Sequence, residues 1–251
     1  MKKLLLAGLI ALTLTSCNEL LQVANTIGTS TLPVSEAENS MGLKNSLDVG
    51  IVNAVNFLGV ENGFMNDALV KVLLPPEAKP IIDNIKLIPG GQELVNRAIL
   101  SLNRSAEDAV KEATPIFKRA ITSMTIQDAT GILFGGDNAA TNYLRNKTYT
   151  DLTNAFAPKV ANSLGKPLVS NFSTTQSWNS LTSAYNQIAN SPVGIVANMK
   201  PVNVNLETYV TQKALDALFL KVANEEKLIR TDPGARVTTI LQRVFGQLDK
   251  R

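Results

Sequence analysis

Residues 207–230 read ETYVTQKALDALFLKVANEEKLIR, the longest clean helical pattern in the chain. Its apolar side chains recur every three or four residues, at Leu215, Leu218, Phe219 and Val222. That spacing places them on one face of an α-helix, and no glycine or proline interrupts the run. The stretch therefore predicts a long amphipathic helix whose apolar face is buried against neighbouring elements.

The same helical spacing runs through most of the chain outside this stretch. Ser35 and Glu38 form a capping box, in which a serine and a glutamate three residues later satisfy the first backbone amides of a helix. Each such box predicts a helix start, and three more occur in the chain: Ser105 with Asp108, Thr125 with Asp128, and Thr148 with Asp151.

Two short segments depart from the helical pattern. The segment from Val70 to Leu74 is an apolar run that prolines stop, and the segment from Val202 to Leu206 alternates apolar and polar residues as a strand does. The predicted fold class is therefore mainly α, a multi-helix single domain. The pattern leaves room for one short two-stranded β element that pairs these two segments.

The first residues have the features of a secretory signal. Lys2 and Lys3 precede a largely apolar run from Leu4 to Leu14, and small residues lead to Cys17. The apolar run is too short for a transmembrane helix, which needs roughly 20 residues. The ending Leu-Thr-Ser-Cys resembles a bacterial lipobox. That resemblance implies cleavage before Cys17, a diacylglyceryl group on its sulfur, and an acyl chain such as palmitate on the new amine.

This interpretation divides the chain into three parts. Residues 1–16 are the expected lipoprotein signal peptide, 17–34 a lipidated tether, and 35–251 a single helical domain. Asn18 stands where an inner-membrane retention signal would often place aspartate, so resemblance to lipoprotein sorting in diderm bacteria favours the outer membrane. We therefore expect a cell-envelope protein that faces the periplasm, with the membrane as its partner through the lipid on Cys17.

The composition restricts the chemistry of the domain. The chain has no histidine and no cysteine other than Cys17, so it lacks the commonest general base, the commonest metal ligand and a free thiol. We expect no metal, no cofactor and no catalytic residue. Loss of Lys2 and Lys3 with the signal lowers the formal net charge from +3 to +1. A near-neutral body argues against nucleic-acid binding, which needs clustered lysine and arginine.

The turn from Gly135 to Asp137, before a predicted helix, is the best candidate for a ligand site. Backbone amides at a helix N-terminus suit an anion or a carboxylate. The turn also fits a left-handed helix C-cap followed by an N-cap, and we favour that interpretation because capping alone explains these residue types. The candidate ligand-binding residues are Gly135, Gly136, Asp137, Asn138, Thr141, Tyr143 and Arg145.

Three aspartates give a competing, catalytic interpretation. Asp128, Asp137 and Asp151 would have to converge to act as acid and base in glycan hydrolysis. Each also stands at a predicted helix start, where a carboxylate satisfies backbone amides and the helix dipole. Capping is therefore the favoured role of all three.

Several blocks of the chain are similar to one uncharacterised bacterial envelope family. One block reads ILFGGDNAATNYL over residues 132–144, and others include Tyr209-Val210 and Val244-Phe245-Gly246. They resemble the domain of unknown function DUF4197, and the similarity covers residues 35–246. The resemblance implies a mostly helical exported or lipid-anchored protein. It implies no known activity and therefore supplies no catalytic residues.

These features predict a lipid-anchored envelope protein that serves as a non-catalytic binding or structural module, with an envelope protein or a glycan as its partner. Two alternatives stay open. A carboxylate-dependent hydrolase of envelope glycans needs two carboxylates roughly 5 to 9.5 Å apart in a cleft. A carrier of an apolar ligand needs a closed apolar cavity of several hundred Å³.

Overall fold

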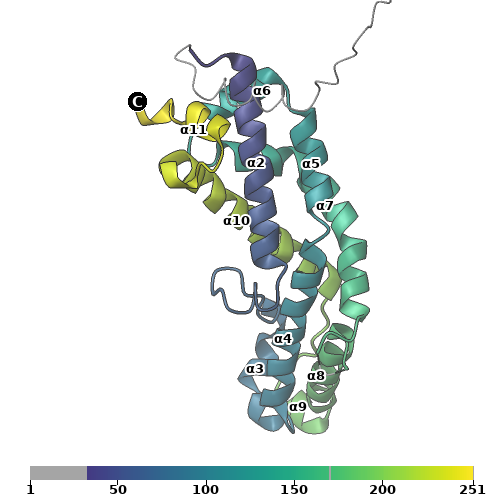
Figure 1. Ribbon diagram of the computed structural model, residues 1–251. Coiled ribbons are helices and arrows are strands. Elements are labelled where there is room, and N and C mark those ends of the chain that lie inside the picture. Colours follow the sequence, from purple (N-terminus) through teal and green to yellow (C-terminus); the bar gives the residue numbers. More distant parts are fainter. Residues whose placement is uncertain (1–32, 170, 251) are drawn as a thin grey trace, which may run out of the picture.

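The computed structural model describes residues 33–169 and 171–250 of the chain. The predicted signal peptide, Cys17 and nearly all of the predicted tether lie outside these residues. Within the described residues the prediction of a mainly α, single-domain fold is confirmed (Figure 1). The elements are α2 (Glu36–Leu58), η1 (Pro76–Ala78), α3 (Lys79–Asp83), η2 (Ile85–Leu87), α4 (Gly91–Val110), α5 (Thr114–Ser123), α6 (Ile126–Leu133), α7 (Ala139–Gly165), α8 (Thr174–Ala189), α9 (Pro192–Val196), α10 (Leu206–Thr231), η3 (Pro233–Ala235), α11 (Thr239–Phe245) and η4 (Leu248–Lys250).

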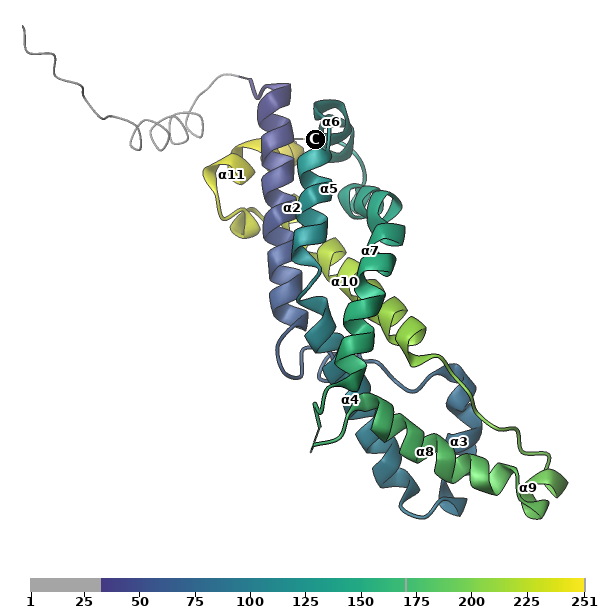
Figure 2. The same cartoon turned by 90° about the vertical axis from the view of Figure 1, so that its right-hand side faces the viewer.

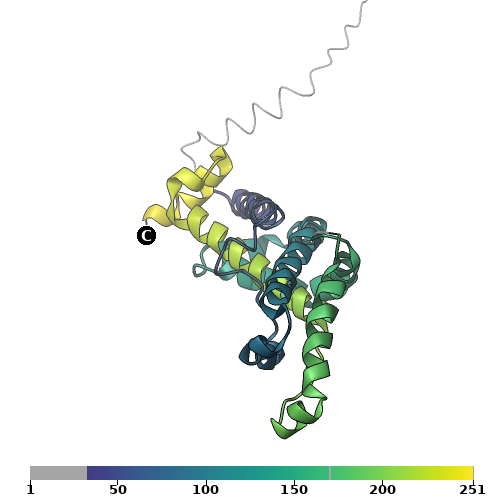
Figure 3. The ribbon, with the colours of Figure 1, turned by 90° about the horizontal axis from the view of Figure 1, so that it is seen from below.

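The helices form an elongated body (Figures 1 and 2). α2, α5, α6 and α11 gather at one end, and α3, α8 and α9 lie at the other. α10 packs against α2, α4 and α7 and so joins most of the body. The view from below in Figure 3 shows α8 leading out to α9, away from the other helices. Among the described residues, no helix is long and apolar enough to span a bilayer.

The apolar face of α10 is buried as its spacing predicts. Leu215, Leu218, Phe219 and Val222 are all at most 1% exposed. The ring of Phe219 meets Phe117 of α5 edge to face, with 5.5 Å between the ring centroids. Removal of these side chains from water is the main contribution that holds α10 at the centre of the body.

Two of the four predicted capping boxes are confirmed. The amide of Glu38 donates to Ser35 Oγ at 3.2 Å at the start of α2, and the amide of Asp128 donates to Thr125 Oγ1 at 3.1 Å at the start of α6. In both boxes the acidic side chain accepts a hydrogen bond from the cap residue's own amide. The two helix starts are thereby fixed by local sequence.

The other two predicted boxes are wrong, because their residues lie inside long helices. Ser105 belongs to α4, and its hydroxyl bonds to Thr174 Oγ1 of α8 at 2.7 Å. Thr148 belongs to α7 and donates to the Leu144 carbonyl one turn back at 2.6 Å. Their hydroxyl groups serve helix packing and backbone bonding rather than capping.

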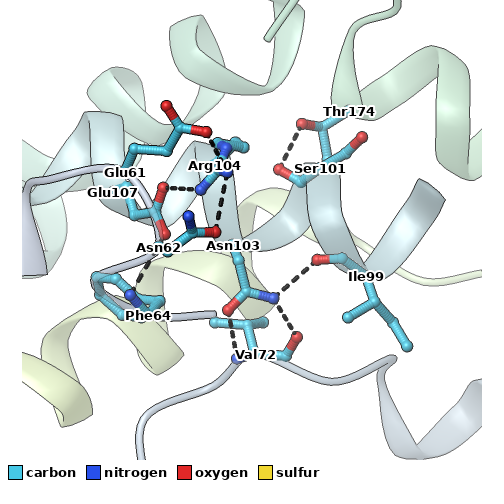
Figure 4. A network of polar contacts seen from close by, with 10 residues as sticks. All are labelled: Glu61, Asn62, Phe64, Val72, Ile99, Ser101, Asn103, Arg104, Glu107 and Thr174. Atoms are coloured by element: carbon cyan, nitrogen blue, oxygen red, sulfur yellow. Dashed lines mark hydrogen bonds and ion pairs between the residues drawn. The ribbon is translucent and has the colours of Figure 1, made fainter. Parts of the chain in front are cut away.

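The optional β pair is not present among the described residues, where both segments are loops held by asparagine side chains. Asn103 of α4 accepts from the Val72 amide at 2.9 Å and donates to the Val72 carbonyl at 2.8 Å (Figure 4). Asn186 of α8 bonds the amide and carbonyl of Val202 in the same way, at 2.8 and 3.0 Å. Each side-chain amide supplies the bonds that a neighbouring strand would have made, so each valine is buried without a sheet.

A charged network fixes the connection between α2 and α3 onto α4. Arg104 bonds to Glu61 at 2.8 Å, to Asn62 at 3.0 Å and to Glu107 at 2.6 Å (Figure 4). Glu107 is 3% exposed and also accepts from the amide of Phe64. Because buried carboxylates are stable only when paired and hydrogen-bonded, this network and Asn103 together hold an otherwise irregular segment in place.

Candidate functional site

The corner between α6 and α7 contains the predicted Gly-Gly-Asp turn. Neither Gly135 nor Gly136 has a positive φ, so the left-handed C-cap predicted there is wrong. Gly135 is needed for space instead, because an added Cβ would lie 2.9 Å from Cβ of Ala139. Asn138, rather than Asp137, is the N-cap of α7, and its side chain makes no capping bond.

The first amides of α7 are satisfied by the chain itself. The amide of Ala139 donates to the carbonyl of Gly136 at 3.0 Å. The amides of Ala140 and Thr141 donate to the two carboxylate oxygens of Glu226 in α10, at 3.0 and 2.8 Å. Thr141 Oγ1 adds a third bond to Glu226, at 2.7 Å. The helix N-terminus thus binds a carboxylate, as the turn suggests, and that carboxylate is internal.

Glu226 forms a buried ion pair that connects three helices. Arg230 Nε donates to Glu226 at 2.9 Å, and both side chains are about 5% exposed. The remaining guanidinium donors of Arg230 bond to the carbonyls of Ile132 and Leu133 at the end of α6, both at 2.9 Å. The anion therefore faces the positive end of α7 and the cation faces the negative end of α6, which is the favourable arrangement for both helix dipoles.

The candidate ligand-binding residues separate around α7. Asn138, Thr141 and Arg145 line one wall of a groove that we call the α7–α10 groove. Tyr143 lies on another face of α7, and the turn from Gly135 to Asp137 is not part of the groove lining. The structure thus brings together three of the seven residues, and a ligand role for any of them stays a prediction.

The α7–α10 groove lies between these two helices and the connection from α2 to η1. Its volume is about 660 Å³, within the range usual for small-molecule sites. Its apolar lining includes Leu69, Leu73, Leu74, Phe219 and Leu220. The side chains of Leu69, Leu73 and Leu220 stay partly open to solvent even though the fold buries most leucines. The groove therefore offers apolar surface that the protein itself does not cover.

One wall of the groove carries a positioned arginine. Arg145 of α7 pairs with Asp216 of α10 across the groove. Its guanidinium carbon also lies 5.3 Å from the ring centroid of Tyr149 and 5.1 Å from that of Phe219. Ring faces attract a cation, so these two rings and Asp216 together hold Arg145 at the wall of the groove.

Two lysines make the groove positive. Lys71 and Lys213 line it and form no ion pair among the described residues. Lys213 Nζ lies 5.8 Å from the ring centroid of Tyr209, whose hydroxyl donates to the Leu73 carbonyl at 3.0 Å. Burial, with a smaller contribution from the negative charge of Glu77, raises the pKa of Tyr209, so this hydroxyl stays a neutral donor. Within the part of the chain that the structure describes, Asp216 is the only carboxylate that lines the groove, and it is already paired.

A second hollow, on the other side of α7, bears on the hydrolase alternative. It has a volume of about 580 Å³ and is lined by Asp128, Asp151 and Tyr143, but not by Asp137. Hydrogen bonds from Thr125 hold the pKa of Asp128 below its ordinary value, aided by the Tyr143 hydroxyl at 3.3 Å. The general acid of a glycan hydrolase needs a raised pKa, whereas the pKa of Asp128 is lowered, so Asp128 does not suit that role.

The α7–α10 groove also contains residues that the sequence pattern did not single out as ligand-binding, among them Lys71, Tyr209, Lys213 and Leu220. Three of them recur at helical spacing along α10, which places them on one face of that helix. That signal was available in the sequence. It could not have been linked to α7 or to Lys71, because the contact between these segments depends on the tertiary fold.

The comparisons with known proteins identify a family and nothing further. The model of the family described as "Protein of unknown function (DUF4197)" matches residues 33–246. No curated protein and no solved structure matches the chain. Within the described residues there is also no group of acidic or other ligating side chains that could hold a metal ion.

Proposed function

Because the chain belongs to the DUF4197 family, whose function is unknown, we propose its role from its own residues. It is a lipid-anchored protein of the bacterial envelope, attached to the outer membrane, that binds an anionic amphiphile in the α7–α10 groove without catalysing a reaction. The observation that carries this proposal is the coexistence of an apolar lining with three cationic side chains in one groove of about 660 Å³.

The ligand class follows from the two kinds of lining. An acyl chain would cover the leucines that the fold leaves exposed, which is favourable at roughly 0.8 kcal/mol per buried CH₂. Its acidic head group would lie among Lys71, Arg145 and Lys213, where Arg145 and Asp216 balance each other and the lysines leave positive charge. A plain glycan would leave the leucines in water, and a neutral lipid would leave the lysines without a partner.

The anchor is supported by the sequence before the described residues. A basic start, a short apolar run and the Leu-Thr-Ser-Cys17 ending together fit a lipoprotein signal. Cys17→Ser should abolish incorporation of labelled palmitate and move the protein out of the washed membrane fraction. Palmitate labelling that the Cys17→Ser change leaves intact would overturn the assignment of Cys17 as the lipidated residue.

The groove is tested with oleate and lysophosphatidylglycerol as probes, by calorimetric titration of the lipid-free chain 18–251. All side chains of the buried apolar core lie between Leu43 and Phe245, so this form carries a complete core. Leu220→Asp places a charge on the apolar lining and should weaken binding about tenfold or more. The matched control is Leu228→Asp, a leucine on the same helix that is similarly exposed, 47% against 37%, and lies outside the groove.

The cationic part of the groove is tested by a second variant with its own control. Lys213→Glu reverses a charge in the groove and should weaken both probes, whereas Lys227→Glu, on the same helix outside the groove, should not. The loss should shrink at high salt, because exposed charges are screened. The proposed ligand class would be wrong if the groove variants and their controls lost the same affinity for the probes. It would also be wrong if the unmodified chain bound neither probe.

A further inference from the structure

The short helix α9 exposes an apolar tip. Val193, Ile195 and Val196 are 72, 68 and 89% exposed, which is high for branched apolar side chains. α9 lies at the far end of the body from the start of α2, as Figures 1 and 2 show. We call these three side chains the α9 tip.

The backbone holds the α9 tip in one conformation. Ser191 caps α9 by accepting from the Gly194 amide at 3.2 Å and donates to the Ile188 carbonyl at 2.7 Å. After the C-terminal end of α9, the Met199 amide donates to the Gly194 carbonyl at 2.9 Å. An added Cβ on Gly194 would lie only 2.2 Å from the Ile188 carbonyl oxygen, so only glycine allows the turn to fold back this closely. These contacts give the α9 tip a defined backbone conformation.

The charge around the α9 tip is unusual for an exposed surface. Residues 152–206 contain no aspartate and no glutamate, and Lys200 lies four residues after Val196. The carboxylates on two neighbouring elements are paired: Asp83 of α3 with Lys79 at 2.7 Å, and the three carboxylates of α4, which packs against α8, with Arg97, Arg104 and Lys166. The α9 tip is therefore apolar, and the segment around it, residues 152–206, carries positive but no negative side chains.

We propose that the α9 tip inserts into the surface of an anionic lipid bilayer. Three branched side chains beside a lysine can enter the boundary between head groups and acyl chains, and the absence of carboxylates avoids repulsion from acidic lipids. The tip is too small for a stable protein interface, which buries roughly 800 Å² on each partner. It provides a membrane contact separate from the lipid on Cys17 and independent of the α7–α10 groove.

The test uses the lipid-free chain 18–251 and co-sedimentation with vesicles of phosphatidylglycerol mixed with phosphatidylethanolamine. The variant Ile195→Ser/Val196→Ser removes the apolar tip, and Val237→Ser is the matched control. Val237 is 68% exposed and lies two residues before the start of α11, the helix that Figure 1 shows at the other end of the body. We expect the tip variant to lower the partition coefficient by about tenfold or more, with no change for the control. We also expect weaker binding to vesicles of phosphatidylcholine alone.

A second variant reports insertion directly. Val196→Trp places a tryptophan on the tip, and its emission should shift to the blue when vesicles are added and be quenched by brominated acyl chains. Unchanged emission, or equal sedimentation of the tip variant and the unmodified chain, overturns the proposal. Dimers in analytical ultracentrifugation that vanish in the tip variant would assign the surface to self-association instead. Leu220→Asp should leave vesicle binding intact, so failure of the groove proposal is distinguishable from failure of this one.

Discussion

The clearest quantitative prediction concerns Glu226. In the variant Glu226→Gln the side chain keeps its length and one oxygen, but its NH₂ group must face donors. Those donors are the amide and hydroxyl of Thr141 on one side, or the amide of Ala140 and the guanidinium of Arg230 on the other. One orientation loses the bonds from the Ala140 amide and Arg230, and the other loses the bond from the Thr141 amide, because the Thr141 hydroxyl can turn and accept from the NH₂ group. In both orientations Arg230 becomes a buried cation without its anion.

The magnitude follows from the burial of this pair. Both side chains are about 5% exposed, so water cannot replace the lost partners. Removing one member of a buried ion pair costs about 3 to 5 kcal/mol. Because glutamine retains one acceptor, we expect a loss near the lower end, about 3 kcal/mol. Domains of this kind have roughly 5 to 15 kcal/mol of total stability, so the variant should still fold.

The assay is urea unfolding of the chain 18–251, followed by far-ultraviolet circular dichroism, with the slope against urea compared between variants. Asp83→Asn is the control, since it breaks an exposed pair with Lys79, where a loss of at most about 1 kcal/mol is expected. A loss for Glu226→Gln no larger than that of Asp83→Asn would refute the reasoning that this carboxylate joins α6, α7 and α10.

Two further predictions rest on other polar contacts. Asn103→Ala leaves the buried amide and carbonyl of Val72 without partners and should lower the free energy of unfolding in urea by about 2 to 4 kcal/mol. Asn186→Ala should lower it less, because the bonds from Asn186 to Val202 are only partly buried. Equal losses for the two variants would show that burial does not set the cost. A hydrogen bond from Lys221 holds the pKa of Asp67 below 3.8, so its stabilisation is present above about pH 4 and is lost as the pH falls through the lowered pKa. Unfolding titrations between pH 6 and 2 should therefore be flatter for Asp67→Asn than for the unmodified chain, and identical curves would contradict this assignment.

The helices were predictable where sequence spacing and local capping agree. α10 and the boxes at Ser35 and Thr125 follow from residues within one or two turns of each other. The boxes at Ser105 and Thr148 failed because the same residue pattern occurs inside helices, where the amides three residues on are already bonded to carbonyls one turn back. Local pattern alone cannot tell an unsatisfied amide from a satisfied one.

The predicted β pair failed for a related reason. Alternating apolar residues show that a segment is extended and half-buried, but they do not show what satisfies its backbone. Here Asn103 and Asn186 do so from helices 31 and 16 residues away. The α7–α10 groove was out of reach of sequence reasoning because its walls come from segments that meet only in the folded chain.

The Gly-Gly-Asp corner shows how a correct local inference can lead to a different site. The turn does precede a helix whose amides take a carboxylate, but Glu226 already occupies the amides of Ala140 and Thr141. An external anion therefore gains nothing from the dipole of α7 at that point and must be recognised by side-chain cations. Thr141 also lines the groove, so the internal carboxylate fixes one of its walls before any ligand arrives. Because this wall is ordered before binding, the binding free energy does not have to offset the entropy lost in ordering it. An open groove can therefore bind an amphiphile without closing over it.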